Sequence, residues 1–138
     1  MEILRSDSKS IRLSLSRGDL VFVNNILNEV CNGFRVADFI KQIGINQQNA
    51  HILLARVHDA GERPSGEGSG KVDSKEFRQN CTALDFTRAE LMAIRNALCE
   101  TLRGLGIEEF DTRVGLSFKE GQVRLSYFYK LVEGMRPL

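Results

Sequence analysis

The chain has 138 residues, with 19 Lys and Arg against 18 Asp and Glu, a formal charge of +1 and an apolar share of 42%. This length and composition fit one folded domain and exclude global disorder. No apolar run exceeds four residues, whereas a membrane-spanning helix needs roughly 20, and the charged start of the chain argues against a secretory signal. The near-neutral charge argues against a nucleic-acid partner.

A shift of 71 residues aligns the chain with itself over 42 positions, starting at Leu13 in the first copy. Ten of these positions are identical, where about three are expected by chance. The identical pairs are Leu13/Leu84, Arg17/Arg88, Leu20/Leu91, Asn25/Asn96, Leu27/Leu98, Glu29/Glu100, Gly33/Gly104, Phe39/Phe110, Gly44/Gly115 and Leu54/Leu125. The alignment predicts a single domain of two pseudo-symmetric units that share a core, with repeat 1 over 11–60, a linker over 61–80 and repeat 2 over 81–134.

Each unit begins with a short alternating stretch, 11–15 or 83–86, which is typical of a strand. Ser16 and Thr87 follow, each three residues before an acidic side chain, and this is the spacing of a capping box. A strand that leads directly into a helix is therefore predicted in both units.

The predicted helix has apolar residues three and four positions apart, which places them on one face. These residues are Leu20, Val23, Leu27, Val30 and Cys31 in the first unit and Leu91, Ile94, Leu98 and Leu102 in the second. Gly33 and Gly104 follow these helices and predict left-handed turns that end them.

Two structures are open for the end of each unit. Alternation over 110–118 and again over 123–131 predicts a β-hairpin in the second unit. In the first unit, Asn46 stands at a helix N-cap position, and the residues after it place an apolar face at helical spacing. Because both units should share one structure, we favour a second helix in each, over 117–132 in the second unit, with the hairpin as the alternative.

The stretch from Asp59 to Asn80 is rich in glycine and polar residues, which predicts a flexible connector. Within it, 66–71 resembles a phosphate-binding loop. The pattern fails, because Ser65 occupies the first glycine position and Val72 replaces the Ser or Thr that would bind magnesium. No nucleotide is therefore expected.

Cys31, Cys81 and Cys99 form an odd, scattered set without a C-x-x-C pair. This pattern predicts reduced structural thiols rather than a disulfide framework or a zinc site. We expect a cytoplasmic protein without a metal or another cofactor.

The segments 25–29 and 96–100 both read N-x-L-x-E, and 109–115 reads E-F-D-T-R-V-G. Together they are similar to a pattern in small uncharacterised bacterial proteins, in which an N-x-L-x-E helix precedes an E-F-x-T-R-x-G segment. The first unit departs from this pattern, with Lys41-Gln42 where the second unit has Thr112-Arg113. The resemblance covers most of both units and implies a bacterial origin.

Asn25 and Glu29 fall on the helix face opposite the apolar stripe, and Asn96 and Glu100 repeat them in the second unit. Two roles are open for these four residues. They form a recognition surface, or they hold the segment that follows, with the Glu100 carboxylate binding the guanidinium of Arg113.

The densest aromatic cluster comprises Phe118, Tyr127, Phe128 and Tyr129. Core packing is the first interpretation, and an exposed interface that uses the tyrosines is the second.

His51 and His58 are seven residues apart, too far along a helix to share a metal ion, and are interpreted as ordinary surface or half-buried histidines. No nucleophile motif accompanies them, so the sequence leans against an enzyme.

The sequence thus predicts an α+β fold of two tandem strand-helix-helix units, with a small antiparallel sheet packed on the helices. The expected function is non-catalytic binding of a protein partner, of the inhibitor or immunity type. The candidate binding residues are Asn25, Glu29, Asn96, Glu100, Arg113, Tyr127 and Tyr129. The alternative is a small-molecule binding protein or an enzyme with a pocket at the seam between the units.

Two observations would separate these hypotheses. An exposed Tyr127 or Tyr129 on a convex surface would favour a protein partner. A pocket lined by Cys31, Cys99 and His51 would favour a small molecule. A homodimer is left open.

Overall fold

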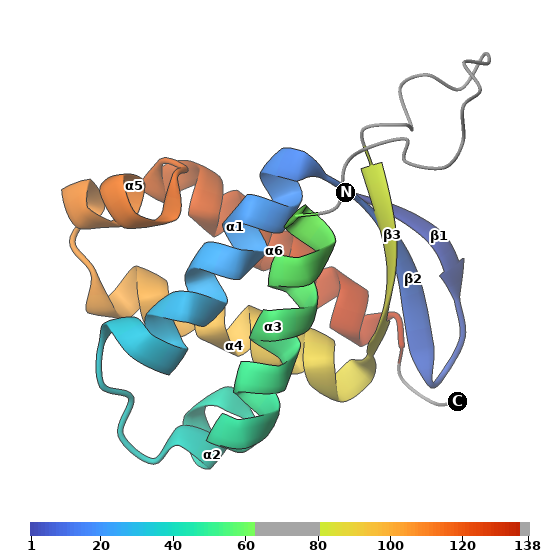
Figure 1. The fold of residues 1–138 in the computed structure, drawn as a ribbon, viewed down its shortest axis with the longest axis horizontal. Helices are drawn as coiled ribbons and strands as arrows, with labels where there is room; N and C mark the ends of the chain where they lie inside the picture. Colours follow the sequence, from blue (N-terminus) through green and yellow to red (C-terminus); the bar gives the residue numbers. More distant parts are fainter. Residues whose placement is uncertain (63–80, 136–138) are drawn as a thin grey trace.

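The computed structural model describes residues 1–62 and 81–135 (Figure 1). It confirms the predicted α+β class, since an antiparallel sheet of three strands lies beside a group of helices. The strands are β1 (Glu2–Ser6), β2 (Ser10–Ser16) and β3 (Cys81–Thr87). The helices are α1 (Arg17–Asn28), α2 (Phe39–Ile43), α3 (Gln47–Glu62), α4 (Arg88–Gly104), α5 (Ile107–Val114) and α6 (Phe118–Glu133), and a π-helical turn, η1 (Glu29–Gly33), extends α1.

Most of the predicted linker lies outside the described residues. The segment that resembles a phosphate-binding loop, 66–71, is entirely outside them. The first two linker residues, Gly61 and Glu62, belong to the last turn of α3.

The sheet has the order β1-β2-β3, and both neighbouring pairs of strands are antiparallel. Ile11, Leu13 and Leu15 of β2 are at most 2% exposed, because alternate residues of a strand face the same side and here face the helices. β1 was not predicted from the sequence. It pairs with β2 at the edge of the sheet, with an irregularity between Ile3 and Arg5, and all five of its residues are exposed.

Both predicted capping boxes are confirmed. The Ser16 hydroxyl accepts a hydrogen bond from the Asp19 amide, and the Ser16 amide donates to the Asp19 carboxylate. Thr87 and Glu90 make the same two bonds at the start of α4. The sheet therefore passes directly into the helices that form the centre of the molecule.

One hydrophobic core joins the two halves of the chain. The central helices α1 and α4 contact each other, α3 packs on α1, and α6 packs on α4. The largest buried side chains include Phe22, Phe86, Phe110 and Phe128, each at most 1% exposed. Burying such a side chain contributes roughly 1.5–3 kcal/mol, so these four phenylalanines are a main source of stability.

The second helix is confirmed in both halves, as α3 and α6, and the hairpin alternative is wrong. Asn46 and Ser117 cap these helices, accepting hydrogen bonds from the amides of Asn49 and Glu120. The short helices α2 and α5, which precede them, were not predicted. The alternation over 110–118 does not form a strand: its first five residues end α5, which buries Phe110 and Val114 four positions apart, and Phe118 begins α6.

The glycines that end the helices differ from the prediction. Gly33 and Gly104 do not adopt left-handed backbone, and the glycines that do are Gly44 (φ 103°) and Gly115 (φ 89°), after α2 and α5. A Cβ at Gly33 would overlap the carboxylate of Glu29, so a larger residue there would displace the end of that side chain. After η1 and α4 the chain continues through extended backbone at Phe34 and Leu105, which requires no positive φ.

The shift of 71 residues that aligns the sequence also relates the limits of several elements. It carries β2 onto β3 and α3 onto α6, and the end of α2 onto the end of α5. We use this shift below to compare corresponding positions in the two halves.

Candidate functional site

Asn25 and Asn96 join the two halves of the molecule. The Asn25 side-chain amide donates to the carbonyl of Val114, the last residue of α5, at 3.0 Å. The Asn96 amide donates to the carbonyl of Ile43, the last residue of α2, at 2.8 Å. Each asparagine therefore caps the C-terminus of the short helix that belongs to the other half.

Glu29 and Arg113 form an ion pair of 2.9 Å between Oε1 and Nη2. The predicted pair between Glu100 and Arg113 is wrong, since Glu100 instead lies 3.3 Å from Arg103 in its own helix. The physical reason is that α5 packs against α1 of the other half, which brings Arg113 to Glu29. The 71-residue shift relates Arg113 to Gln42, so the first half has no arginine at the position where an equivalent ion pair with Glu100 would need one.

The two candidate tyrosines lie in different surroundings. Tyr127 is half-buried, its hydroxyl donates to the Met1 carbonyl at 3.4 Å, and burial raises its pKa. Tyr129 is 48% exposed, and the guanidinium of Arg95 lies 4.7 Å from the centre of its ring. All seven predicted binding residues thus have a partner within the chain, and their joint role as a binding site stays a prediction.

The cysteines and histidines do not assemble into one site. Cys31 lines a hollow of about 460 Å³ with Phe34 and Arg35, and neither Cys99 nor His51 is among its lining residues. Burial raises the pKa of the Cys31 thiol, which disfavours the reactive thiolate. Within 1–62 and 81–135 the three cysteines are free, and no group of His, Cys, Asp and Glu is placed to hold a metal ion.

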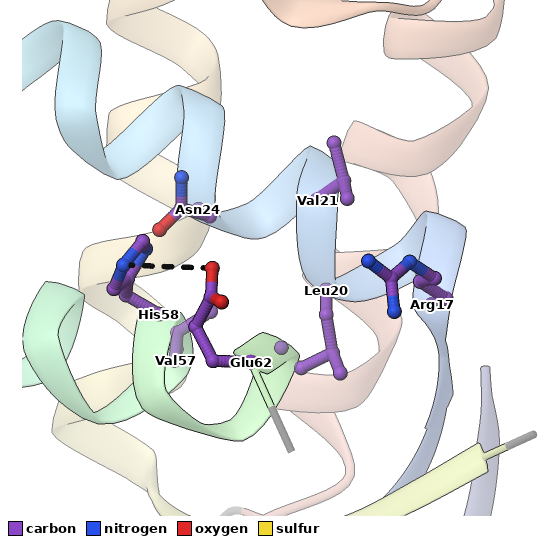
Figure 2. A pocket seen from close by; sticks show the side chains of 8 residues that line it. Arg17, Leu20, Val21, Asn24, Val57, His58 and Glu62 are labelled. Atoms are coloured by element: carbon purple, nitrogen blue, oxygen red, sulfur yellow. Dashed lines mark ion pairs between the residues drawn. The ribbon is translucent and has the colours of Figure 1, made fainter. Parts of the chain in front are cut away.

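A pocket that the sequence analysis missed lies between α1 and α3, with a volume of about 150 Å³ (Figure 2). Figure 2 shows Asn24, His58 and Glu62 together at one end and Arg17 at the other, with Leu20 between them. His58 Nε2 lies 3.8 Å from Glu62 Oε1. The lining residues are Arg17, Leu20, Val21, Asn24, Val57, His58, Gly61 and Glu62.

In the other half, the groove that corresponds to this pocket lies between α4 and α6 and has different side chains. The 71-residue shift carries Asn24 to Arg95 and His58 to Tyr129. Arg95 stacks on Tyr129 and donates to Asn96 Oδ1 at 3.1 Å, so two large side chains occupy the groove between α4 and α6. The smaller Asn24 and His58 leave the groove between α1 and α3 hollow.

The hydrogen bonds around Asn24 leave one buried acceptor unused. Because the Asn25 amide nitrogen donates to Val114, Asn25 presents its oxygen to Asn24, whose nitrogen lies 3.5 Å away. This arrangement directs Asn24 Oδ1 away from Asn25. That oxygen is buried and has no hydrogen-bond partner among the described residues, which costs free energy unless a donor reaches it.

A second hollow, of about 400 Å³, lies on the other side of α1, at the seam between the halves. It is lined by the first turns of α1, by 114–116 and by Arg124. Arg124 is engaged there, because it binds the buried carboxylate of Asp19 at 2.7 Å, and the Met1 ammonium binds the same carboxylate at 3.0 Å. Burial alone would raise the pKa of Asp19, but these partners and the Ser16 amide lower it to about 2.

Three residues of α1 form a ridge that we call the α1 ridge, namely the exposed Arg17 and Val21 and the half-buried Asn24. Arg17 and Val21 line both hollows, so the ridge separates them. Val21 is 48% exposed, and Arg17 is exposed and makes no hydrogen bond or ion pair within the described parts of the chain. Their spacing of four and three residues is a helical-face signal that was readable in the sequence.

The comparisons with protein-family models, with curated proteins and with solved structures find no match to this chain. In the part of the chain that the structure describes, no helix has the length and apolar character needed to cross a membrane.

Proposed function

We propose that this protein is a non-catalytic binding protein that docks a protein partner on the α1 ridge. The observation that carries the proposal is Arg17, whose guanidinium has no partner among the described residues, beside the exposed Val21, on a ridge with a hollow on each side. Arginine and large apolar side chains supply much of the energy at protein interfaces, and hollows beside them receive side chains of the partner.

The partner that fits this surface presents an acidic group to Arg17 and an apolar group to Val21. An inhibitor or immunity protein of bacterial origin works in this way, by covering a functional surface of its target. The exposed Tyr129 and the absence of Cys99 and His51 from the lining of the Cys31 hollow also favour a protein partner over a small molecule.

The test is affinity capture from the lysate of the source organism, quantified by mass spectrometry. The tag belongs at the C-terminal end, because the Met1 ammonium is ion-paired with Asp19. We expect a specific protein to be captured by the wild type and lost with Arg17→Glu and with Val21→Asp.

The matched control is Ile52→Asp, which places the same charge at a 59% exposed residue of α3 that does not line either hollow. This variant should retain the captured protein. Identical capture by all variants would contradict the proposal.

The seam hollow supports a second candidate, a small-molecule binding protein or enzyme. At about 400 Å³ and with a lining from both halves, it falls in the size range of small-ligand pockets. Native mass spectrometry of the purified protein tests this candidate. An added mass that survives desalting and is lost with Leu116→Arg would favour a small-molecule ligand.

A further inference from the structure

We propose that the pocket between α1 and α3 receives the side chain of a lysine or arginine from the partner. The charged end of that side chain would bind the exposed Glu62 carboxylate and, after the Asn24 side chain turns toward the pocket, the now buried Asn24 Oδ1. This inference rests on the proposed function, because it specifies the chemistry of the partner that docks on the α1 ridge.

The first argument is the pattern of donors and acceptors. Asn24 Oδ1 is a buried acceptor without a donor among the described residues, and Glu62 adds a carboxylate at the same end of the pocket (Figure 2). Ammonium and guanidinium groups are donors without acceptors, so they match this end, and bonds of this kind are stronger than those between neutral groups.

The second argument is the shape of the pocket. Leu20 and Val57 provide apolar wall in the pocket, and Leu20 lies between the acceptor end and Arg17 (Figure 2). The methylene stem of a lysine or arginine packs on such surface while its charged end binds polar groups. The volume of about 150 Å³ is below the range of roughly 300–1,000 Å³ for small-molecule sites. One inserted side chain is the occupant that fits.

The third argument comes from the other half of the same chain. In the groove between α4 and α6, the chain places its own guanidinium, that of Arg95, over Tyr129. The corresponding positions in the first half are Asn24 and His58, so a basic side chain is what the first groove lacks. Arg17, at the opposite end of the pocket (Figure 2), would bind an acidic residue next to the inserted one.

The experiment is an NMR titration of the ¹⁵N-labelled full chain with Nα-acetyl-lysine methylamide and Nα-acetyl-arginine methylamide. Nα-acetyl-norleucine methylamide is the control probe, because it has a similar stem without the charge. We expect the basic probes to shift the Asn24 side-chain amide resonances and the backbone resonances of His58 and Glu62, and norleucine to leave them in place.

Variants then locate the binding. Glu62→Gln should weaken binding of the basic probes about fivefold, the size of effect expected for one partly exposed ion pair. Asp59→Asn is the matched control, because it removes the same charge from α3 at a residue outside the pocket. Asn24→Arg should abolish probe binding, because it places in the first half the residue that the second half has at position 95.

Equal shifts from norleucine, or an unchanged affinity in Glu62→Gln, would overturn the inference. Spectra of each variant without probe show that it is folded. If the probe experiments fail in this way but Arg17→Glu still abolishes capture of a partner, the proposed function stands and only the inserted basic side chain is wrong. If capture does not depend on the α1 ridge, the proposed function fails whatever the probes do.

Discussion

Leu13 of β2 lies directly opposite Leu84 of β3 in the sheet, and these two residues are 71 positions apart in the chain. An antiparallel pair in which corresponding residues face each other has a local two-fold axis between them. Asn25 and Asn96 obey the same relation, since each caps the short helix of the other half. Residues that looked like a recognition surface in the sequence thus bind the halves to each other.

Asn25→Ala and Asn96→Ala should each lower the free energy of unfolding by about 1 kcal/mol, because each leaves a helix-terminal carbonyl without its donor. Urea unfolding followed by circular dichroism measures this loss. Asn32→Ala is the control, since among the described residues that side chain bonds to the exposed Asn28 alone. Losses no larger than that of the control would mean that these bonds do not stabilise the contact between the halves.

Glu29 and Arg113 should show a coupling energy of about 1 kcal/mol in a double-mutant cycle of stability with Glu29→Gln and Arg113→Met, because the carboxylate is largely buried in the ion pair. A cycle that combines Glu100→Gln with Arg113→Met should be additive, since Glu100 pairs with Arg103. Coupling in the second cycle and none in the first would contradict the observed pairing.

Gly121→Ala should destabilise the protein, although Gly121 lies inside α6 and alanine is the better helix former. A Cβ at this position would lie 2.6 Å from Cζ of the buried Phe110 ring. Overpacking of this kind costs about 1–3 kcal/mol, against a gain of about 1 kcal/mol in helix propensity. Thermal unfolding should show a lower Tm, whereas Ser126→Ala, on the exposed face of the same helix, should not lower it. An unchanged or higher Tm for Gly121→Ala would show that the ring moves aside freely.

Stability should fall between about pH 4 and pH 2 because of Asp19. Its pKa is lowered from 3.8 to about 2 in the folded protein, so its contribution is complete above the unfolded value and is lost as the pH falls through the folded value. This pKa shift corresponds to a contribution of about 2 kcal/mol to the free energy of unfolding above about pH 4. Asp19→Asn should be less stable at neutral pH and have a flatter profile over this range in urea unfolding at several pH values. Asp59→Asn, whose carboxylate is exposed, should keep the wild-type slope, and parallel profiles for all three proteins would refute the assignment to Asp19.

Strands β2 and β3, the capped central helices and the second helix of each half were predictable because their signals are local. Alternation, capping spacing and apolar stripes depend on neighbours within one or two turns. β1 and the short helices α2 and α5 were missed. β1 buries none of its five residues, so it lacks the alternation of a half-buried strand, and α2 has only five residues. Gly44 and Gly115, the glycines after the short helices, were missed for the same reason, and the left-handed turns were assigned to Gly33 and Gly104 instead.

The contacts between the halves were not predictable in the same way. Glu100 precedes Arg113 by 13 positions in the chain, which made it the nearer candidate partner. No local sequence pattern shows that α5 turns toward Glu29 of the other half. The pocket has a similar origin, because Asn24 and His58 lie 34 positions apart in the chain and only the packing of α3 on α1 brings them together. The sequence did contain one signal of the pocket: the 71-residue shift aligns the small Asn24 of the first half with the large Arg95 of the second.

The groove between α1 and α3 is open and the groove between α4 and α6 is filled, and this difference bears on how many partners the protein binds. A homodimer of identical units carries every substitution twice, so its two grooves are either both open or both filled. A single chain with two halves can fill one groove with Arg95 and Tyr129 and leave the other open. If the open groove is the docking face that we propose, such a molecule would engage one partner at a time rather than link two partners into a chain.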